Sequence, residues 1–257
     1  QGLDSKRFTP RGVHGIISNW KNELVSPAEA ADGAENIFDR KHAEVYAEYQ
    51  ARLLKAGAMD FDDLLAKTVE LFKNHGDVLE HYRERFAHIL VDEYQDTNNA
   101  QNQMVLMLAG GHNNVCVVGD TDQSVYRFRG ADFRNILQFE EAFPDVTTVV
   151  LDQNYRSTQT ILDAANAVIE NNTERRPKSL WTDSGSGERI QRYHAEDEGD
   201  EANWVAGTAK QLQRDADANF RDIAVLYRTN AQSRVIEEAF MRQGVPYKVV
   251  GGTRFYD

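Results

Sequence analysis

The stretch Ile89-Leu90-Val91-Asp92-Glu93-Tyr94-Gln95-Asp96-Thr97 decides the fold, because an uninterrupted apolar run is followed directly by a polar, acidic one. Such an apolar run is typical of a strand that is buried on both faces of a parallel sheet. Similar runs return at Val115-Cys116-Val117-Val118 and at Val149-Val150-Leu151, with helical windows between them. This alternation predicts an α/β fold in which helical crossovers connect parallel strands.

The pattern changes on both sides of this core. The residues before about His88 have helical periodicities, and Ser26-Pro27-Ala28-Glu29 is the clearest helix start because Ser26 can cap and Pro27 suits the first helical position. After the core, strand-like runs at 190–193, 223–227 and 247–250 alternate with helical segments. We therefore expect an all-helical N-terminal part followed by two α/β units, with a boundary near residues 145–153.

Composition narrows the class of protein. The 257 residues include 29 basic and 41 acidic ones, and the net charge of −12 argues against coating nucleic acid by bulk electrostatics while leaving room for local basic patches. Hydrophobic residues at 41% exclude disordered and collagen-like chains. The single cysteine, Cys116, is predicted to be a small buried hydrophobe in a reducing, cytoplasmic protein. No apolar run approaches the roughly 20 residues of a membrane span, and no Cys or His cluster has the spacing of a structural zinc site.

Polar side chains follow each of the three core runs, where open α/β sheets bind ligands. Of the adjacent carboxylates Asp92 and Glu93, one can hold a hydrated Mg²⁺ on a triphosphate while the other orients an attacking water. After the second run, the amide of Gln123 can bond a terminal phosphate. After the third, Arg156 can stabilise charge on the transferred phosphoryl group and Tyr155 can stack on a base.

Each of these features also has a plain structural interpretation. An isolated Asp-Glu pair is more often part of a solvated turn than of a site. Ser157 or Thr158 could simply cap the helix that begins near Gln159. Such interpretations stay open for any one motif taken alone.

Taken together, the motifs resemble those of superfamily 1 DNA helicases of the UvrD, PcrA and Rep type. Asp92-Glu93-Tyr94-Gln95 resembles their Walker B sequence (motif II), residues 119–130 resemble motif III, and Asn154-Tyr155-Arg156-Ser157 resembles motif IV. Residues 59–65 are similar to a helical signature of the family, and residues 227–234 to motif IVa. The order and spacing make the resemblance specific, and it covers essentially the whole chain.

The resemblance implies a nucleotide role for each matching residue. Asp92 would hold the Mg²⁺ of MgATP, and Glu93 would activate the hydrolytic water. Gln123 and Arg156 would contact the γ-phosphate, and Tyr155 would stack near the adenine. ATP and Mg²⁺ are therefore the expected cofactors.

The resemblance also implies a path for single-stranded DNA. Tyr126, Phe128 and Arg129 would line it, while Arg228 and Asn230 would contact the strand from the second motor domain. Aromatic faces stack on bases regardless of sequence and guanidinium groups hold phosphates, which agrees with these roles. The structural alternative is that Tyr126 and Phe128 form the buried face of a short strand. The family commonly has Trp where Phe128 stands.

Two departures from the family pattern indicate an internal piece of a longer polypeptide. The chain contains no Gly-Lys pair, and so no G-x-x-x-x-G-K-[ST] phosphate loop, and motifs V and VI are also missing. We expect a helical insertion (residues 1–57), the latter part of a first RecA-like motor domain (58–150) and the first half of a second (151–257). By itself this piece should not hydrolyse ATP.

The predicted parent is an ATP-dependent 3′ to 5′ DNA helicase and translocase. It would act on single-stranded DNA and on junctions with duplex, in DNA repair or replication and alongside repair proteins. Two other hypotheses remain: a non-catalytic DNA-binding or interaction module that keeps the helicase architecture, and the helicase portion of a helicase-nuclease.

Overall fold

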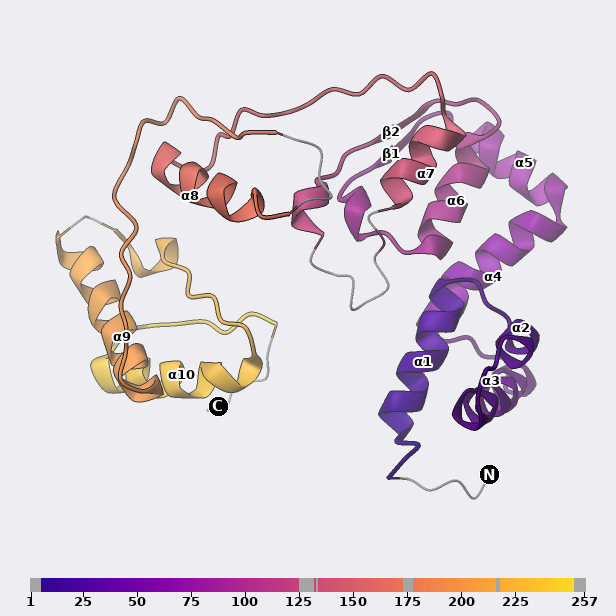
Figure 1. Ribbon diagram of the computed structural model, residues 1–257, viewed down its shortest axis with the longest axis horizontal. Coiled ribbons are helices and arrows are strands. Elements are labelled where there is room, and N and C mark those ends of the chain that lie inside the picture. The colour runs from indigo at the N-terminus through magenta and orange to yellow at the C-terminus, as the bar shows by residue number, and fades with distance from the viewer. Residues whose placement is uncertain (1–5, 125–131, 133, 173–177, 216–217, 252–257) are drawn as a thin grey trace. The chain divides into compact units, whose positions relative to one another are not determined.

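The computed structural model describes residues 6–124, 132, 134–172, 178–215 and 218–251 (Figure 1). The chain divides into two compact units, Gln1–Ser157 with Leu162–Asp183, and Thr158–Ile161 with Ser184–Asp257. Within the described ranges, every helix is too short or too polar to cross a membrane.

The first unit opens with helices, as the sequence predicts. They are α1 (Pro10–Asn22), α2 (Pro27–Asp32), α3 (Ile37–Lys55), α4 (Phe61–Asn74) and α5 (Gly76–Arg85). The predicted start at Ser26 is confirmed: the Ser26 side chain accepts from the Glu29 backbone N–H, and the Glu29 carboxylate accepts from the Ser26 N–H at 2.7 Å. Asp60 and Asp63 form the same capping box at the start of α4.

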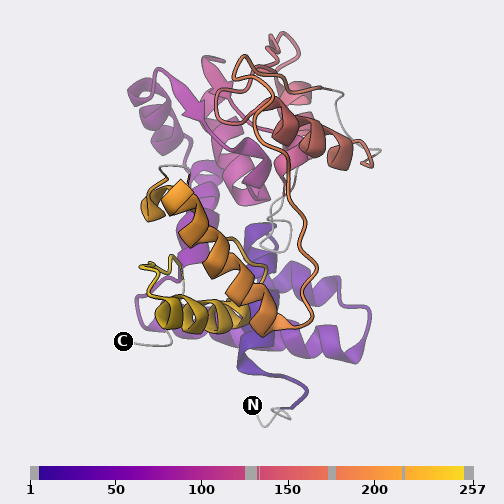
Figure 2. The same cartoon turned by 90° about the vertical axis from the view of Figure 1, so that its left-hand side faces the viewer.

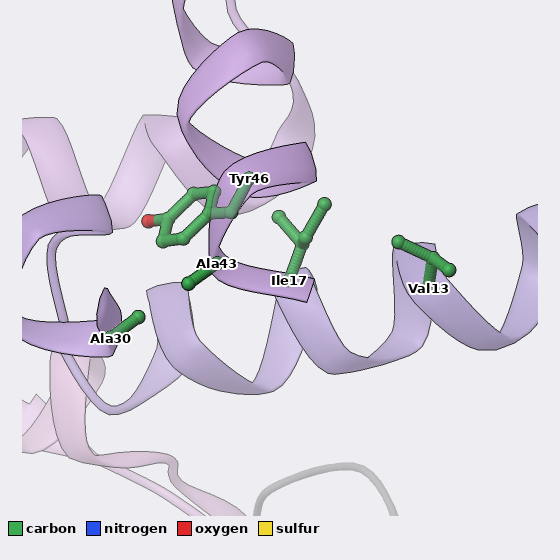
Figure 3. Packing of buried hydrophobic residues seen from close by; sticks show 5 residues of the cluster. All are labelled: Val13, Ile17, Ala30, Ala43 and Tyr46. Atoms are coloured by element: carbon green, nitrogen blue, oxygen red, sulfur yellow. The ribbon is translucent and has the colours of Figure 1, made fainter. Parts of the chain in front are cut away.

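A small apolar core joins α1, α2 and α3. Val13 and Ile17 of α1 pack against Ala30, Ala43 and Tyr46, all of them buried (Figure 3). The Tyr46 hydroxyl donates to the backbone carbonyl of Val25 at 3.2 Å, so its polar end is satisfied inside this core.

The middle of the unit contains the predicted parallel strands and their helical crossover. β1 (Ile89–Val91) pairs in parallel with β2 (Val115–Val117), and α6 (Asn99–Ala109) lies between them in the chain. The short helices η1 (Tyr94–Asp96) and η2 (Thr121–Gln123) follow the two strands, and α7 (Asn135–Ala142) comes later. Tyr94, Val105 and Phe139 form the buried cluster against one face of this sheet.

Several predictions about the strands are wrong. The sheet is covered on one face only: Leu90 is 78% exposed and Cys116, its partner in the register, is also exposed rather than buried. The third run, 149–151, is not a strand, and its side chains are 62–75% exposed. The runs at 190–193, 223–227 and 247–250 are likewise outside strands. An apolar run becomes a strand only where a neighbouring backbone completes its hydrogen bonds, and within the described residues these runs have no such ladder.

The second unit is built on two packed helices. It contains α9 (Glu198–Asp215), η4 (Phe220–Asp222), η5 (Asn230–Gln232) and α10 (Ser233–Gln243). The division between the units falls within α8 (Gln159–Ile169), whose residues from Leu162 on belong to the first unit. α9 lies against α10 in both views (Figures 1 and 2). Small residues on α9, Ala202 and Ala206, allow Phe240 of α10 to pack closely.

Candidate functional site

The first group of site residues lies where β1 ends. Val118 accepts from the Tyr94 N–H at 2.9 Å, which turns the chain just beyond the strand. Glu93 adopts a left-handed conformation, with φ 51° and ψ 43°, a backbone shape that is uncommon for residues other than glycine. Its N–H donates to Asp92 Oδ1 at 2.9 Å. Both side chains are exposed, so two carboxylates reach solvent at the carboxyl edge of the sheet, as predicted.

A buried amide, Gln95, connects this edge to the neighbouring loop. Gln95 is 1% exposed; its Nε2 donates to Glu93 Oε2 at 2.7 Å and its Oε1 accepts from the Asp120 N–H at 2.9 Å. Gly119 permits this contact, because a Cβ there would lie only 2.8 Å from Gln95 Oε1. Sequence reasoning assigned Gln95 no role, although its position two residues after Glu93 was part of the quoted motif.

The loop after β2 continues the same network. Asp120 Oδ2 accepts from Gln123 Nε2 at 2.9 Å, and Oδ1 accepts from the Asp122 N–H at 3.0 Å. Lys178 forms an ion pair with the same carboxylate. Burial by itself would raise the pKa of Asp120, but the hydrogen bonds from Lys178, Gln123 and the Asp122 backbone lower it. The structure therefore links Glu93 to Gln123 through Gln95 and Asp120.

The third group forms a separate turn. Asn154 Oδ1 accepts from the N–H groups of Arg156 and Ser157, at 2.9 and 2.7 Å. Tyr155 is 83% exposed, with its hydroxyl donating to Gln153, and Arg156 is exposed as well. Within the described residues, no hydrogen bond or ion pair brings Tyr155 or Arg156 to the Glu93–Gln123 network.

The residues expected to contact DNA fall in two places. Tyr126, Phe128 and Arg129 lie outside the described residues. Arg228 and Asn230, in the second unit, precede α10 in a turn where Gln232 Oε1 accepts from the Arg228 N–H at 3.0 Å. Both side chains are exposed, which leaves the guanidinium and the amide at the surface of that unit.

The carboxylates at this edge of the sheet suit a metal ion that binds together with a phosphate. They suit less well a cation that is held by protein side chains alone. No group of three or more His, Cys, Asp or Glu residues within the described ranges could hold a metal ion. Mg²⁺ commonly binds through one or two carboxylates together with substrate phosphates and water. The exposed carboxylate of Asp92, at the end of β1, fits that kind of coordination.

Comparison with known protein families shows which family the chain belongs to. Residues 1–144 match the UvrD/REP helicase N-terminal domain, and residues 149–257 match the UvrD-like helicase C-terminal domain. The chain belongs to the UvrD-like helicase family. Membership implies a RecA-like α/β motor, of which the described part shows a small parallel sheet with its helical crossover.

Individual UvrD-like relatives are similar along the whole chain. This chain is 52% identical to the ATP-dependent DNA helicase PcrA of Staphylococcus aureus (strain NCTC 8325 / PS 47) over 257 residues. It is 51% identical to the ATP-dependent DNA helicase PcrA of Bacillus subtilis (strain 168), also over 257 residues. Each alignment covers 100% of this chain and 35% of the relative. The PcrA of Leuconostoc citreum is 50% identical over 255 residues, 99% of this chain and 34% of the relative. The chain thus spans about a third of the length of these relatives, and the family predicted from the motifs is confirmed.

Proposed function

We propose that this chain is part of an ATP-dependent DNA helicase that moves 3′ to 5′ along single-stranded DNA. The observation that carries the proposal is the hydrogen-bond chain from Glu93 through Gln95 and Asp120 to Gln123. It supports a site in which the group that activates water and the group that contacts the γ-phosphate are held in one network. ATP and Mg²⁺ are the proposed cofactors.

In this proposal, the side chains at the edge of the sheet divide the work of hydrolysis. Asp92 would hold Mg²⁺, which neutralises charge on the phosphates. Glu93 would accept a proton from the attacking water, with the Gln95 amide fixing the carboxylate in place. Gln123 would hydrogen-bond the γ-phosphate from a side chain already held by Asp120.

The remaining proposed contacts come from other parts of the chain. Arg156 would reach the γ-phosphate and Tyr155 the adenine, since both are exposed and free to meet a ligand. Tyr126, Phe128 and Arg129 would line the DNA path, and Arg228 and Asn230 would contact the strand from the second motor domain.

The proposed domain organisation is that of the family. Residues 1–57 would form a helical insertion, residues 58–150 part of the first motor domain, and residues 151–257 part of the second. Hydrolysis between the two motor domains would move their DNA-gripping surfaces relative to each other. The substrate would be single-stranded DNA and its junctions with duplex, in cytoplasmic DNA repair or replication.

The test is phosphate release from MgATP, with and without single-stranded DNA, for this chain and for the complete protein that contains it. We expect DNA-stimulated turnover in the complete protein and none in the chain alone. Glu93→Gln should lower turnover by about 100-fold or more while ATP still binds, because a general base typically contributes that much. Glu84→Gln, an exposed carboxylate on α5, is the matched control and should leave turnover unchanged.

Two results would contradict the proposal. Full hydrolysis by the Glu93→Gln protein would remove the assigned role of Glu93. DNA binding without any ATP turnover by the complete wild-type protein would instead favour a binding module that keeps the helicase architecture.

A further inference from the structure

Lys178 makes a contact that the site described above does not explain. It lies after α8 in the sequence, yet its Nζ forms an ion pair with Asp120 and lies 3.6 Å from Asp122 Oδ2. The side chains of Lys178, Asp120 and Asp122 are only 19%, 21% and 9% exposed. This is a partly buried ion pair, which solvent screens less than a surface pair.

The contact acts on the carboxylate that holds Gln123. Lys178 binds Asp120 at Oδ1, where the Asp122 N–H also donates, and Gln123 Nε2 donates to Oδ2. Partners on both oxygens leave the carboxylate little freedom to rotate. The Gln123 amide that depends on it is therefore held in one orientation as well.

The segment that begins at Lys178 also reaches the turn that carries Arg156. The Asn154 N–H donates to the Trp181 carbonyl at 2.7 Å, and the Trp181 N–H donates to the Asp152 carbonyl at 3.1 Å. Gln153 Nε2 donates to Asp183 at 2.9 Å. One short stretch, residues 178–183, is thus bonded both to the loop of Gln123 and to the turn of Arg156.

Charge gives Lys178 a second effect. Asp120 and Asp122 place two negative charges beside the side chain that would meet a phosphate, and like charges repel. The ammonium of Lys178 neutralises one of them at that position.

We propose that Lys178 is a positioning residue for ATP hydrolysis. It orients Gln123 through Asp120, reduces the repulsion between the Asp120–Asp122 pair and an incoming triphosphate, and ties this loop to the turn of Arg156. The inference rests on the proposed function, since it assigns Lys178 a part in that same nucleotide site.

The experiment measures kcat and KM for MgATP of the complete protein with saturating single-stranded DNA. Lys178→Met should lower kcat/KM by about tenfold or more, because small misplacements of a catalytic group have effects of that size. Lys178→Arg, which keeps the charge, should stay within about threefold of wild type. Lys41→Met removes an exposed ion pair with Glu44 and is the control for loss of a lysine.

A double-variant cycle separates positioning from general damage to the fold. If Lys178 acts through Asp120, adding Asp120→Asn to Lys178→Met should cause a smaller loss than Asp120→Asn causes in the wild-type protein, because both substitutions disturb the same ion pair. Thermal unfolding of each variant would show whether a loss of activity follows from a loss of folded protein.

The outcomes are distinguishable. Suppose that the wild-type protein turns over ATP, that Glu93→Gln abolishes this turnover, and that the Lys178→Met protein has the kinetics of wild type. This result would overturn the role of Lys178 and leave the proposed function standing. Two other results would also overturn the role of Lys178. One is that the separate losses of kcat/KM caused by Lys178→Met and by Asp120→Asn multiply in the double variant. The other is that Lys178→Arg lowers kcat/KM as much as Lys178→Met does. No turnover by the wild-type complete protein would overturn both proposals.

Discussion

Replacing Lys21 by Met should destabilise the helical part of the first unit more than replacing any exposed lysine. Lys21 is 2% exposed on α1, and its Nζ lies 2.7 Å from Asp60 Oδ2 and 3.0 Å from Asp63 Oδ1. It also lies over the ring of Tyr49, 5.2 Å from the centroid. This one ammonium therefore connects α1 to the start of α4.

The magnitude follows from what the substitution leaves behind. The Asp63 side chain is 2% exposed and that of Asp60 is 16% exposed, so the substitution would leave two carboxyl groups in a poorly hydrated place without their cation. Breaking a buried pair on one side typically costs about 3 to 5 kcal/mol. Asp60 keeps the Tyr49 hydroxyl and Asp63 keeps the Gln50 amide, so we expect the lower end, about 3 kcal/mol.

The loss should depend on pH. Burial by itself would raise the pKa of Asp60, but hydrogen bonds from Lys21, the Asp63 backbone and the Tyr49 hydroxyl lower it. A lowered pKa in the folded state stabilises the protein above the unfolded pKa of about 3.9, and this stabilisation disappears as the pH falls through the folded value. The difference between wild type and Lys21→Met should therefore shrink below about pH 4.

Urea unfolding followed by Trp20 fluorescence is the assay, in a background where Trp181 and Trp204 are Phe, so that only the α1 core reports. Lys41→Met, whose pair with Glu44 is exposed, is the control and should lose less than about 1 kcal/mol. A Lys21→Met protein that loses no more than this control would refute the reasoning, and so would a loss that stays constant on acidification.

Two further substitutions test the network behind the site. Gly119→Ala should lower ATP turnover of the complete protein by about tenfold or more, because the new Cβ would displace Gln95. The control is Gly15→Ala, because Gly15 has open space around it. Equal activity of the two proteins would show that Gln95 does not need this contact. Tyr94→Phe should lower the free energy of unfolding by about 1 to 3 kcal/mol, because it takes away the hydroxyl that donates to the buried Asn102 Oδ1; an unchanged urea midpoint would contradict this.

Local signals in the sequence predicted much of the fold correctly. The start of α2 at Ser26 was predictable because a capping box needs only two residues three positions apart. The parallel pair β1 and β2 followed from two apolar runs with a helical window between them. The family was also readable in advance, because its motifs are short, ordered and rich in particular residue types.

The failed predictions concern strands, whose formation depends on distant partners. Residues 149–151 have the same apolar composition as β1 but remain outside any sheet. Leu90 and Cys116 sit in the predicted strands but face away from the cluster of Tyr94, Val105 and Phe139. An apolar run specifies that burial is favourable, and the rest of the structure decides whether a covering surface exists.

For the site, the sequence by itself determined which functional groups are present: the carboxylates Asp92 and Glu93, the amide Gln123 and the guanidinium Arg156. Only the tertiary structure decided what holds them. Gln95 bridges the loops that follow two strands, and Lys178 returns from beyond α8 to Asp120, 58 residues away in the chain. Hydrogen bonds and ion pairs depend on distances of a few ångströms between atoms, and for residues far apart in sequence the folded chain sets those distances.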